Sequence, residues 1–162
     1  MVHRKQFMAL AAAGLISVMS LGSAFTAYAD GWTKSGDKWT YVENNATRKG
    51  WVHTSDGYYY MDLSTGYMST GFVQIDGKWY SFCSWGGVRT GWFNYDGNKY
   101  YLHEDGHMED NALNVNGTMY LFKSWGGMYH DQWLTLNGSQ YYFRSWGGRY
   151  QNCTATINGK QY

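Results

Sequence analysis

The stretch Asp76-Gly77-Lys78-Trp79-Tyr80-Ser81-Phe82 decides the fold, because variants of it recur along the whole chain. Each variant centres on a glycine, and these glycines stand at positions 36, 57, 77, 97, 117, 138 and 159. Successive glycines are therefore 20 or 21 residues apart. A period this constant is the signature of a repeat protein, in which each repeat is one supersecondary unit.

The residues around each glycine predict a β-hairpin. Asp-Gly and Asn-Gly pairs between β-prone runs are the strongest short-range hairpin signal, because a type I′ turn needs two residues with positive φ. In the third repeat we expect strands at residues 72–75 and 78–82 on either side of Asp76-Gly77. The predicted fold class is all-β, a solenoid of about seven consecutive hairpins that occupies residues 30–162 as one repeat domain.

Counting from each glycine separates the two faces of the second strand, because strand side chains alternate. The third residue after the glycine is always aromatic: Trp39, Tyr60, Tyr80, Tyr100, Tyr120, Tyr141 and Tyr162. The fifth residue is Tyr41, Asp62, Phe82, Leu102, Phe122 or Phe143. We expect these two positions to form an inward seam. The opposite face, which carries Tyr59, Met61, Trp79 and Tyr101, is expected to meet solvent or ligand.

Residues 1–29 have the features of a signal peptide. His3-Arg4-Lys5 precede an apolar run, and Ala27-Tyr28-Ala29 fits a cleavage site. The alternative is a retained membrane anchor, but polar and glycine residues interrupt the run. No later apolar stretch approaches the length of a membrane span. We therefore expect a secreted product that is no integral membrane protein once the leader is removed.

The charge of the remaining chain excludes some partners. Without Arg4 and Lys5 there are eleven basic and twelve acidic residues, a net charge of −1. This charge gives no electrostatic footprint for nucleic acid or anionic lipid. Cys83 and Cys153 could form a disulfide in an exported protein. They stand 70 residues apart in different phases of the repeat, so two unpaired, small apolar side chains are an equal alternative.

Catalytic, metal and cofactor chemistry finds little support in the sequence. His103-Glu104-Asp105-Gly106-His107 holds potential ligands, but the spacing is not that of a zinc or calcium site. The aspartates before the repeat glycines are explained as turn residues. A solenoid would hold them about one repeat apart, too far for paired carboxylate catalysis. We expect no enzyme, no metal and no cofactor.

The repeat resembles a known family in its composite phrase. Gly71-Phe72 is one of the Gly-aromatic pairs that open a repeat, Gly77 to Phe82 follow, and Thr90-Gly91-Trp92 opens the next repeat. This phrase is similar to the cell-wall-binding repeat of choline-binding proteins, and to repeats of glucan-binding domains and clostridial toxins. The resemblance covers residues 31–162. It implies a left-handed hairpin solenoid with choline cages between consecutive hairpins, in which aromatic faces attract a quaternary ammonium.

The resemblance also implies candidate site residues. Tyr59, Met61 and Phe72 would form one cage, and Trp79 and Trp92 two walls of another. Trp51, Tyr101 and Trp133 are further candidates. Three Ser-Trp-Gly-Gly segments add Trp85, Trp125 and Trp146, which could either stack on sugar rings or fold back between hairpins.

We therefore predict a secreted, non-catalytic protein at the cell surface or wall that binds choline-bearing teichoic acid or a similar cell-wall polysaccharide. The first alternative is a glucan-binding or host-glycan-binding adhesin module that uses tryptophan platforms. A wall-lytic enzyme would need a catalytic domain, for which the repeats leave no room. The sequence ends within a hairpin, so self-association through the last repeat, or a fragment that has lost binding, are further possibilities.

Overall fold

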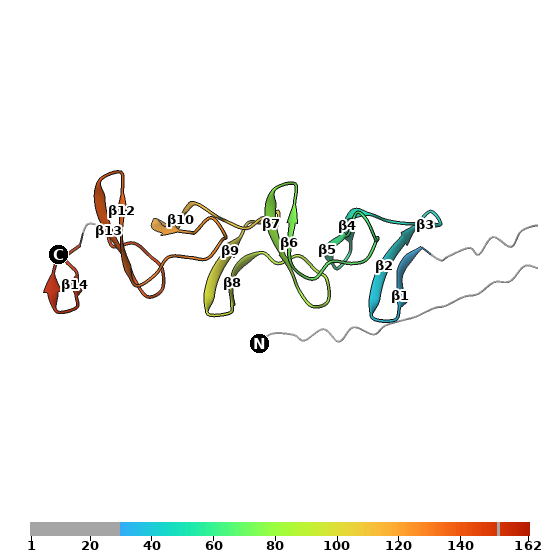
Figure 1. Cartoon of the computed structure of the whole chain (residues 1–162), viewed down its shortest axis with the longest axis horizontal. Helices are drawn as coiled ribbons and strands as arrows, with labels where there is room; N and C mark the ends of the chain where they lie inside the picture. Colours follow the sequence, from blue (N-terminus) through green and yellow to red (C-terminus); the bar gives the residue numbers. More distant parts are fainter. Residues whose placement is uncertain (1–29, 152) are drawn as a thin grey trace, which may run out of the picture. The chain divides into compact units, whose positions relative to one another are not determined.

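The computed structural model describes residues 30–151 and 153–162, so the expected signal peptide lies outside the described residues. Within these ranges the chain forms fifteen strands and no helix. Figure 1 shows the strands as consecutive hairpins, each made of neighbours in sequence. The predicted all-β fold of seven hairpins is confirmed.

The chain divides into two compact units. The first unit contains the described residues up to 70 together with residues 84–87; the second contains residues 71–83 and 88–162. Strands of the first unit are β1 (Gly31–Ser35), β2 (Lys38–Glu43), β3 (Ala46–Thr47), β4 (Gly50–Thr54) and β5 (Gly57–Met61). Strands of the second unit are β6 (Gly71–Ile75), β7 (Lys78–Phe82), β8 (Gly91–Tyr95), β9 (Asn98–Leu102), β10 (Ala112–Val115), β11 (Thr118–Leu121), β12 (Gln132–Leu136), β13 (Ser139–Phe143), β14 (Thr156–Ile157) and β15 (Lys160–Gln161).

All five hairpins of the second unit have the predicted turn. Asp76 and Gly77 both have positive φ, +49° and +80°, and Ile75 pairs with Lys78 across the turn. Both central residues of a type I′ turn need positive φ, which glycine and short polar residues tolerate best. The other four turns have positive φ at Asp96-Gly97, Asn116-Gly117, Asn137-Gly138 and Asn158-Gly159.

The two hairpins of the first unit differ from the prediction. The β1–β2 turn is Gly36-Asp37, with positive φ at the glycine alone, and the β4–β5 turn is Ser55-Asp56, one residue earlier than expected. A shift of one residue moves every side chain to the opposite face of a strand. The assignment of Trp39, Tyr41 and Asp62 to the inward seam was therefore wrong. Tyr60 also lies on the face opposite Tyr59 and Met61, but it is buried as predicted, with 8% of it exposed. The inward positions are taken by the preceding or following residues: Thr40, Tyr59, Val42 and Met61.

The innermost position of each hairpin is the residue that pairs with the start of its first strand. Phe82 pairs in this way with Gly71, and Phe143 with Gln132. Five residues at this position are at most 5% exposed: Val42, Met61, Phe82, Leu102 and Phe143. Phe122 is equally buried, but it lies one residue beyond the Ala112–Leu121 pair and donates its N–H to Asn111 O. Each of the first six hairpins thus contributes one deeply buried apolar side chain to the core of its unit.

The tyrosines expected in the seam are buried to different degrees. Tyr100 is buried, Tyr80, Tyr120 and Tyr141 are half-buried, and none of these four is fully exposed. Burial raises the pKa of the Tyr100 hydroxyl above its ordinary value, and Asp96 adds to the effect. Tyr162 departs from the prediction, because 53% of it is exposed.

A tight loop after each second strand connects one hairpin to its neighbour. Lys123 N donates to Gly127 O at 2.9 Å, which closes the loop, and Met128 N then donates to Lys99 O in the preceding hairpin at 2.8 Å. Arg149 N donates in the same way to Met119 O, and in the first unit Met68 N donates to Trp39 O. Consecutive hairpins within each unit are therefore stacked through backbone hydrogen bonds as well as through side chains.

The structure also bears on the expected membrane topology and on the two cysteines. Over residues 30–151 and 153–162 there is no helix of the length and apolarity needed to cross a membrane. Cys83 and Cys153 both carry free thiols, the first half-buried and the second exposed.

Candidate ligand-binding site

The same group of three aromatic rings recurs along the hairpins, and we call it an aromatic triad. Its members are the tryptophan of a first strand, the residue paired with it across the hairpin, and a tyrosine of the next hairpin. In the first unit these residues are Trp32, Tyr41 and Tyr59. The ring centre of Trp32 lies 5.2 Å from that of Tyr41 and 4.7 Å from that of Tyr59.

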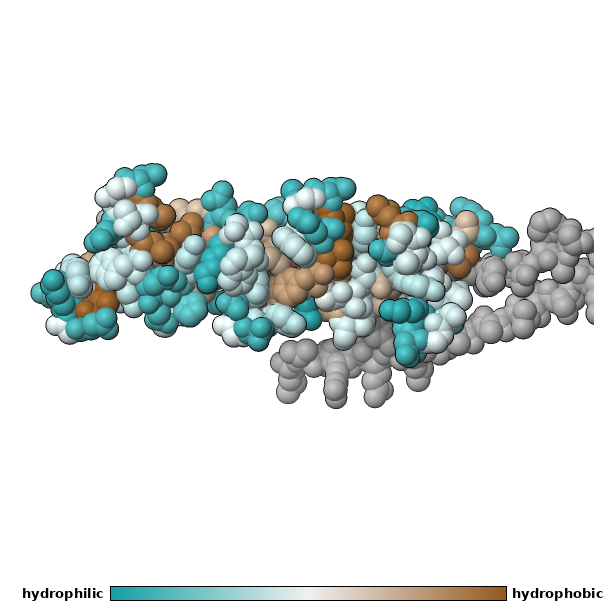
Figure 2. Space-filling model, viewed as in Figure 1, coloured by the Kyte–Doolittle hydropathy of each residue, from teal (hydrophilic) through white to brown (hydrophobic). Residues whose placement is uncertain are grey.

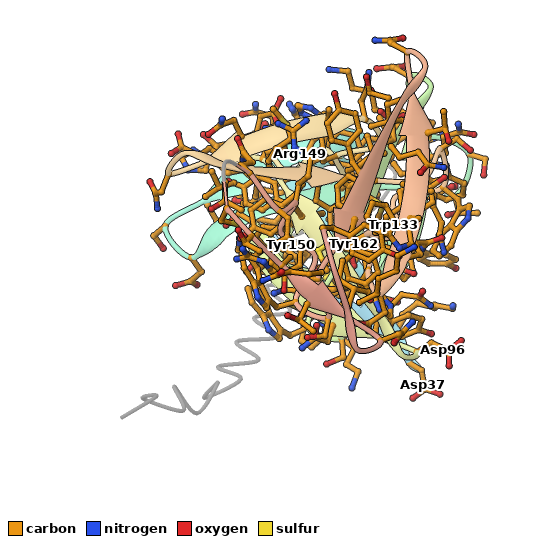
Figure 3. All side chains as sticks on the ribbon, turned by 90° about the vertical axis from the view of Figure 1, so that its left-hand side faces the viewer. Asp37, Asp96, Trp133, Arg149, Tyr150 and Tyr162 are labelled. Atoms are coloured by element: carbon orange, nitrogen blue, oxygen red, sulfur yellow. The ribbon has the colours of Figure 1, made fainter. Side chains whose placement is uncertain are left out.

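The second unit contains two more aromatic triads. In the Trp92 triad, the indole lies 5.0 Å from Tyr101 and 4.8 Å from Tyr120, measured between ring centres. In the Trp133 triad, the indole lies 5.4 Å from Tyr142 and 4.8 Å from Tyr162. Figure 3 shows Trp133 and Tyr162 next to one another, although they come from different hairpins.

The geometry of the triads suits a cation. Planes of the paired rings are inclined by 57° to 77°, so faces of different rings turn toward a shared corner. A cation within about 6 Å of a ring centre is attracted by the ring quadrupole, by about 0.5–2 kcal/mol per ring. The aromatic triads could therefore bind a cation without any formal negative charge.

One triad already has an internal cation. Lys99 Nζ lies 4.6 Å from the ring centre of Trp92. Lys99 and Tyr101 are two residues apart on β9, so their side chains leave the same face of the strand. The face of Trp92 is thus accessible to a positive charge, and the ammonium of Lys99 competes there with any cationic ligand.

The tryptophans of the Ser-Trp-Gly-Gly loops are partly exposed and also pack against the hairpins, so both alternatives left open by the sequence apply in part. Trp85, Trp125 and Trp146 are 43–47% exposed, yet each packs by its edge on an inward tyrosine, as Trp125 does on Tyr100 at 6.1 Å. The second glycine of each loop makes room for the ring: a Cβ at Gly87 would lie 1.9 Å from the indole of Trp85. Basic residues lie over two of the rings, Lys123 over Trp125 and Arg144 over Trp146.

The residues predicted for the first cage belong to different compact units. Tyr59 and Met61 belong to the first unit, where they form a buried cluster with Val52, and Met61 has no exposed surface. Phe72 belongs to the second unit and packs on Phe93, Tyr95 and Tyr100. Of the three, Tyr59 takes part in an aromatic triad, through its contact with Trp32.

The other predicted site residues contact mainly partners within their own hairpins. Trp79 is exposed and pairs across its hairpin with Gln74, while Trp92 packs on Tyr101 within its own hairpin. Trp51 lies 5.2 Å from Tyr60, its cross-strand partner. Trp92, Tyr101 and Trp133 are triad members, as described above.

Sequence reasoning missed Trp32, Tyr41, Tyr120, Tyr142 and Tyr162 as candidate ligand-binding residues. A usable signal was present, because the turn position fixes which residues face each other across a hairpin. Counting outward from Asn137-Gly138 pairs Trp133 with Tyr142 directly.

The histidines near residue 105 form two acid–base pairs. His103 Nε2 lies 2.9 Å from Glu109 Oε2, and His107 Nδ1 lies 2.6 Å from Asp105 Oδ1. The two imidazole rings stack at 4.1 Å. In the part of the chain that the structure describes, no group of three or more His, Cys, Asp or Glu side chains is arranged to hold a metal ion.

Comparison with known families and structures agrees with this fold. Residues 49–68, 70–80, 90–108 and 131–148 match the cell wall binding repeat of the choline-binding type. The chain belongs to this family of repeat proteins. A comparison with curated protein sequences gave no match.

Solved structures with the same fold come from Streptococcus pneumoniae. CbpJ from strain TIGR4 is 29% identical with a TM-score of 0.76, over 83% of this chain and 49% of that chain. Choline binding protein F, solved in the presence of a tetrasaccharide-pentapeptide peptidoglycan analogue, is 28% identical with a TM-score of 0.75 over the same shares. CbpF in complex with ipratropium is 30% identical with a TM-score of 0.68, over 76% of this chain and 39% of that chain. This chain thus spans about half the length, or less, of these structures.

Proposed function

We propose that this protein binds quaternary ammonium groups, in particular choline carried by a cell-wall polymer such as teichoic acid, through its aromatic triads. In this proposal it is a secreted, cell-surface protein that acts by binding and has no catalytic role. The observation that carries the proposal is the recurrence of one ring geometry at Trp32, Trp92 and Trp133.

Chemistry and relatives both support this ligand class. A quaternary ammonium has no N–H to donate, so ring faces can bind it where hydrogen-bond acceptors cannot. Among the structurally similar proteins, one is named for choline binding and was solved with a peptidoglycan analogue. Because these proteins are longer than this chain, their ligands come to it only as part of the proposal.

Retention on a choline-bearing resin tests the proposal, with two tryptophan variants as a matched pair. Trp133 and Trp79 are similarly exposed, 38% and 39%, but only Trp133 belongs to an aromatic triad. We expect Trp133→Ala to elute at a lower free choline concentration than wild type, whereas Trp79→Ala elutes unchanged. Wild-type protein that passes through the resin, or equal loss in the two variants, would reject the triads as the site.

Binding of a glycan is the second candidate function, supported by the exposed loop tryptophans. Trp125 and Trp146 each keep more than two-fifths of their surface exposed, and flat aromatic faces of this kind stack on sugar rings. This candidate predicts retention on dextran or cell-wall oligosaccharides that free choline does not release. Trp125→Ala together with Trp146→Ala would then abolish retention on the glycan and leave retention on choline intact.

A further inference from the structure

The surroundings of the Trp133 triad contain a positive charge that the proposed function does not use. Tyr142 is a triad member on β13, and Arg144 follows it by two residues, just past the end of that strand. Tyr142 and Arg144 also line one hollow of 280 Å³, together with Tyr150. The cation-binding corner and the guanidinium are therefore adjacent.

The guanidinium of Arg144 has hydrogen-bonding capacity to spare. Its carbon lies 3.9 Å from the ring centre of Tyr150, so the group is held against an aromatic face. Among the residues that the structure describes, none accepts a hydrogen bond from the buried Arg144 Nε, and an Arg144 terminal nitrogen makes a long polar contact, 3.8 Å to Cys153 Sγ. A phosphate in the hollow would instead accept charge-assisted hydrogen bonds from the terminal nitrogens of this guanidinium.

In an equivalent hairpin, a carboxylate pairs with the residue at this position. In the hairpin of the Trp92 triad the same position is His103, and the residue six places later, Glu109, lies 2.9 Å from it. Six places after Arg144 the chain has Tyr150 instead of a carboxylate. Asp131 is the one carboxylate that lines the hollow, and among the described residues no ion pair joins it to Arg144.

We propose that the Trp133 triad and Arg144 form one two-part site for a phosphocholine group, with the quaternary ammonium in the aromatic triad and the phosphate on Arg144. The inference rests on the proposed function and adds to it that the phosphate is recognised. A planar guanidinium is well suited to a phosphate because it offers parallel N–H donors. Free choline gains nothing from Arg144 and is repelled by its charge, so this site distinguishes phosphocholine from choline.

A titration that reports on Trp133 alone tests the two-part site. The protein is labelled with 5-fluorotryptophan, the ¹⁹F resonance of Trp133 is assigned with a Trp133→Phe variant, and choline and phosphocholine are titrated separately. We expect phosphocholine to bind at Trp133 about five- to tenfold more tightly than choline, the range of one charge-assisted hydrogen-bonded contact at a partly exposed site. Arg144→Gln should bring this ratio close to one, through weaker phosphocholine binding and unchanged or tighter choline binding.

Two control variants keep the outcome unambiguous. Lys123→Gln removes the equivalent charge in the preceding hairpin, where Ala112 and Leu121 replace the triad residues, and should leave the ratio unchanged. Arg144→Lys keeps the charge without the planar donors and should give an intermediate ratio. A ratio of one in the wild type, or a ratio that survives Arg144→Gln, would overturn the two-part site while choline binding at Trp133 still supports the proposed function. No shift with either ligand would overturn both.

A sedimentation assay identifies the source of the phosphocholine group. Pelleting with phosphatidylcholine vesicles, abolished by Arg144→Gln, would support the site with a lipid as its ligand. Phosphocholine binding without pelleting would support it with a polymer-linked group. Pelleting that Arg144→Gln leaves unchanged would contradict a role of Arg144 in reading the phosphate.

Discussion

At the scale of single residues, the strand position that carries Lys99 differs between the aromatic triads. It holds Trp39 beside the Trp32 triad, Lys99 beside the Trp92 triad and Gln140 beside the Trp133 triad. Lys99 is the one of the three that is a cation, and its ammonium lies on the ring face that a ligand would use. Two triads with equivalent rings can therefore differ in ligand affinity through one side chain.

Removal of the Lys99 charge should open the Trp92 triad. We expect Lys99→Gln to raise choline affinity at this triad roughly two- to thirtyfold, because the ligand gains a cation–π contact that the lysine now makes. Isothermal titration calorimetry should then detect an additional binding equivalent. Lys78→Gln, an exposed lysine at a hairpin end, serves as the control. An unchanged stoichiometry and affinity in Lys99→Gln would show that the lysine does not obstruct the site.

Asp62 should make stability depend on pH in acid. Hydrogen bonds from the Ser64 hydroxyl and from Thr65 lower the pKa of Asp62 from 3.8 to about 2. A lowered pKa in the folded state stabilises the fold above the unfolded-state pKa, and this stabilisation is lost as pH falls toward 2. Asp62→Asn should therefore be less stable than wild type near neutral pH, with a difference that shrinks between about pH 4 and pH 2.

Denaturant unfolding from pH 2 to pH 7 measures this difference. Asp37→Asn, at an exposed hairpin turn that Figure 3 labels, is the control for the loss of a surface aspartate. A constant difference between Asp62→Asn and wild type across the range would contradict a role for the ionised carboxylate.

At the scale of hairpins, sequence predicted the second unit better than the first. Asp76-Gly77 and its four equivalents place the turns correctly, because two adjacent positive-φ residues leave one position for a type I′ turn. In the β4–β5 hairpin, Tyr58, Tyr59 and Tyr60 are all aromatic, so alternation does not identify the inward face. The structure assigns Met61 to the core opposite Gly50, whereas counting from a turn at Asp56-Gly57 pairs Met61 with Val52, two residues away.

The sequence predicted which class of residue forms the candidate site, but not which rings contact one another. The residue class, aromatic rings of the strands, follows from composition and period. The partners do not, because the prediction joined the outer face of one hairpin to the tryptophan of the next, whereas Trp92 meets Tyr101 of its own hairpin and Tyr120 of the next. That choice depends on how hairpins stack, which backbone contacts such as Met128 N to Lys99 O determine.

The second glycine of the Ser-Trp-Gly-Gly loop leaves space for the tryptophan ring, and a substitution tests this role. Gly87→Ala would bring a Cβ within 1.9 Å of the Trp85 indole, so the ring must move away from Gly87. We expect a loss of about 1–3 kcal/mol in the free energy of unfolding, the usual cost of overpacking, with a change in tryptophan fluorescence. In the Trp85→Ala background the same substitution should cost less than 1 kcal/mol, because the obstructing ring is gone. Equal costs in both backgrounds would mean that the glycine serves the backbone and not the ring.

At the scale of the whole molecule, aromatic triads occur in both compact units. Several weak sites on one chain can raise retention on a multivalent surface by about 10²–10⁴ over a single site. Figure 2 shows that the visible face is mostly hydrophilic or neutral, with separate hydrophobic areas. Most of the large apolar side chains that are exposed are tryptophans and tyrosines, which suits a surface that binds through ring faces.

Crystals of the protein soaked with choline would test the central claim most directly. The account predicts choline in the corners of the Trp32 and Trp133 triads, with the ammonium against the ring faces, and weaker or no occupancy at the Trp92 triad, where Lys99 lies. Choline bound instead at Trp79 or on the loop tryptophans, with all three triads empty, would contradict it.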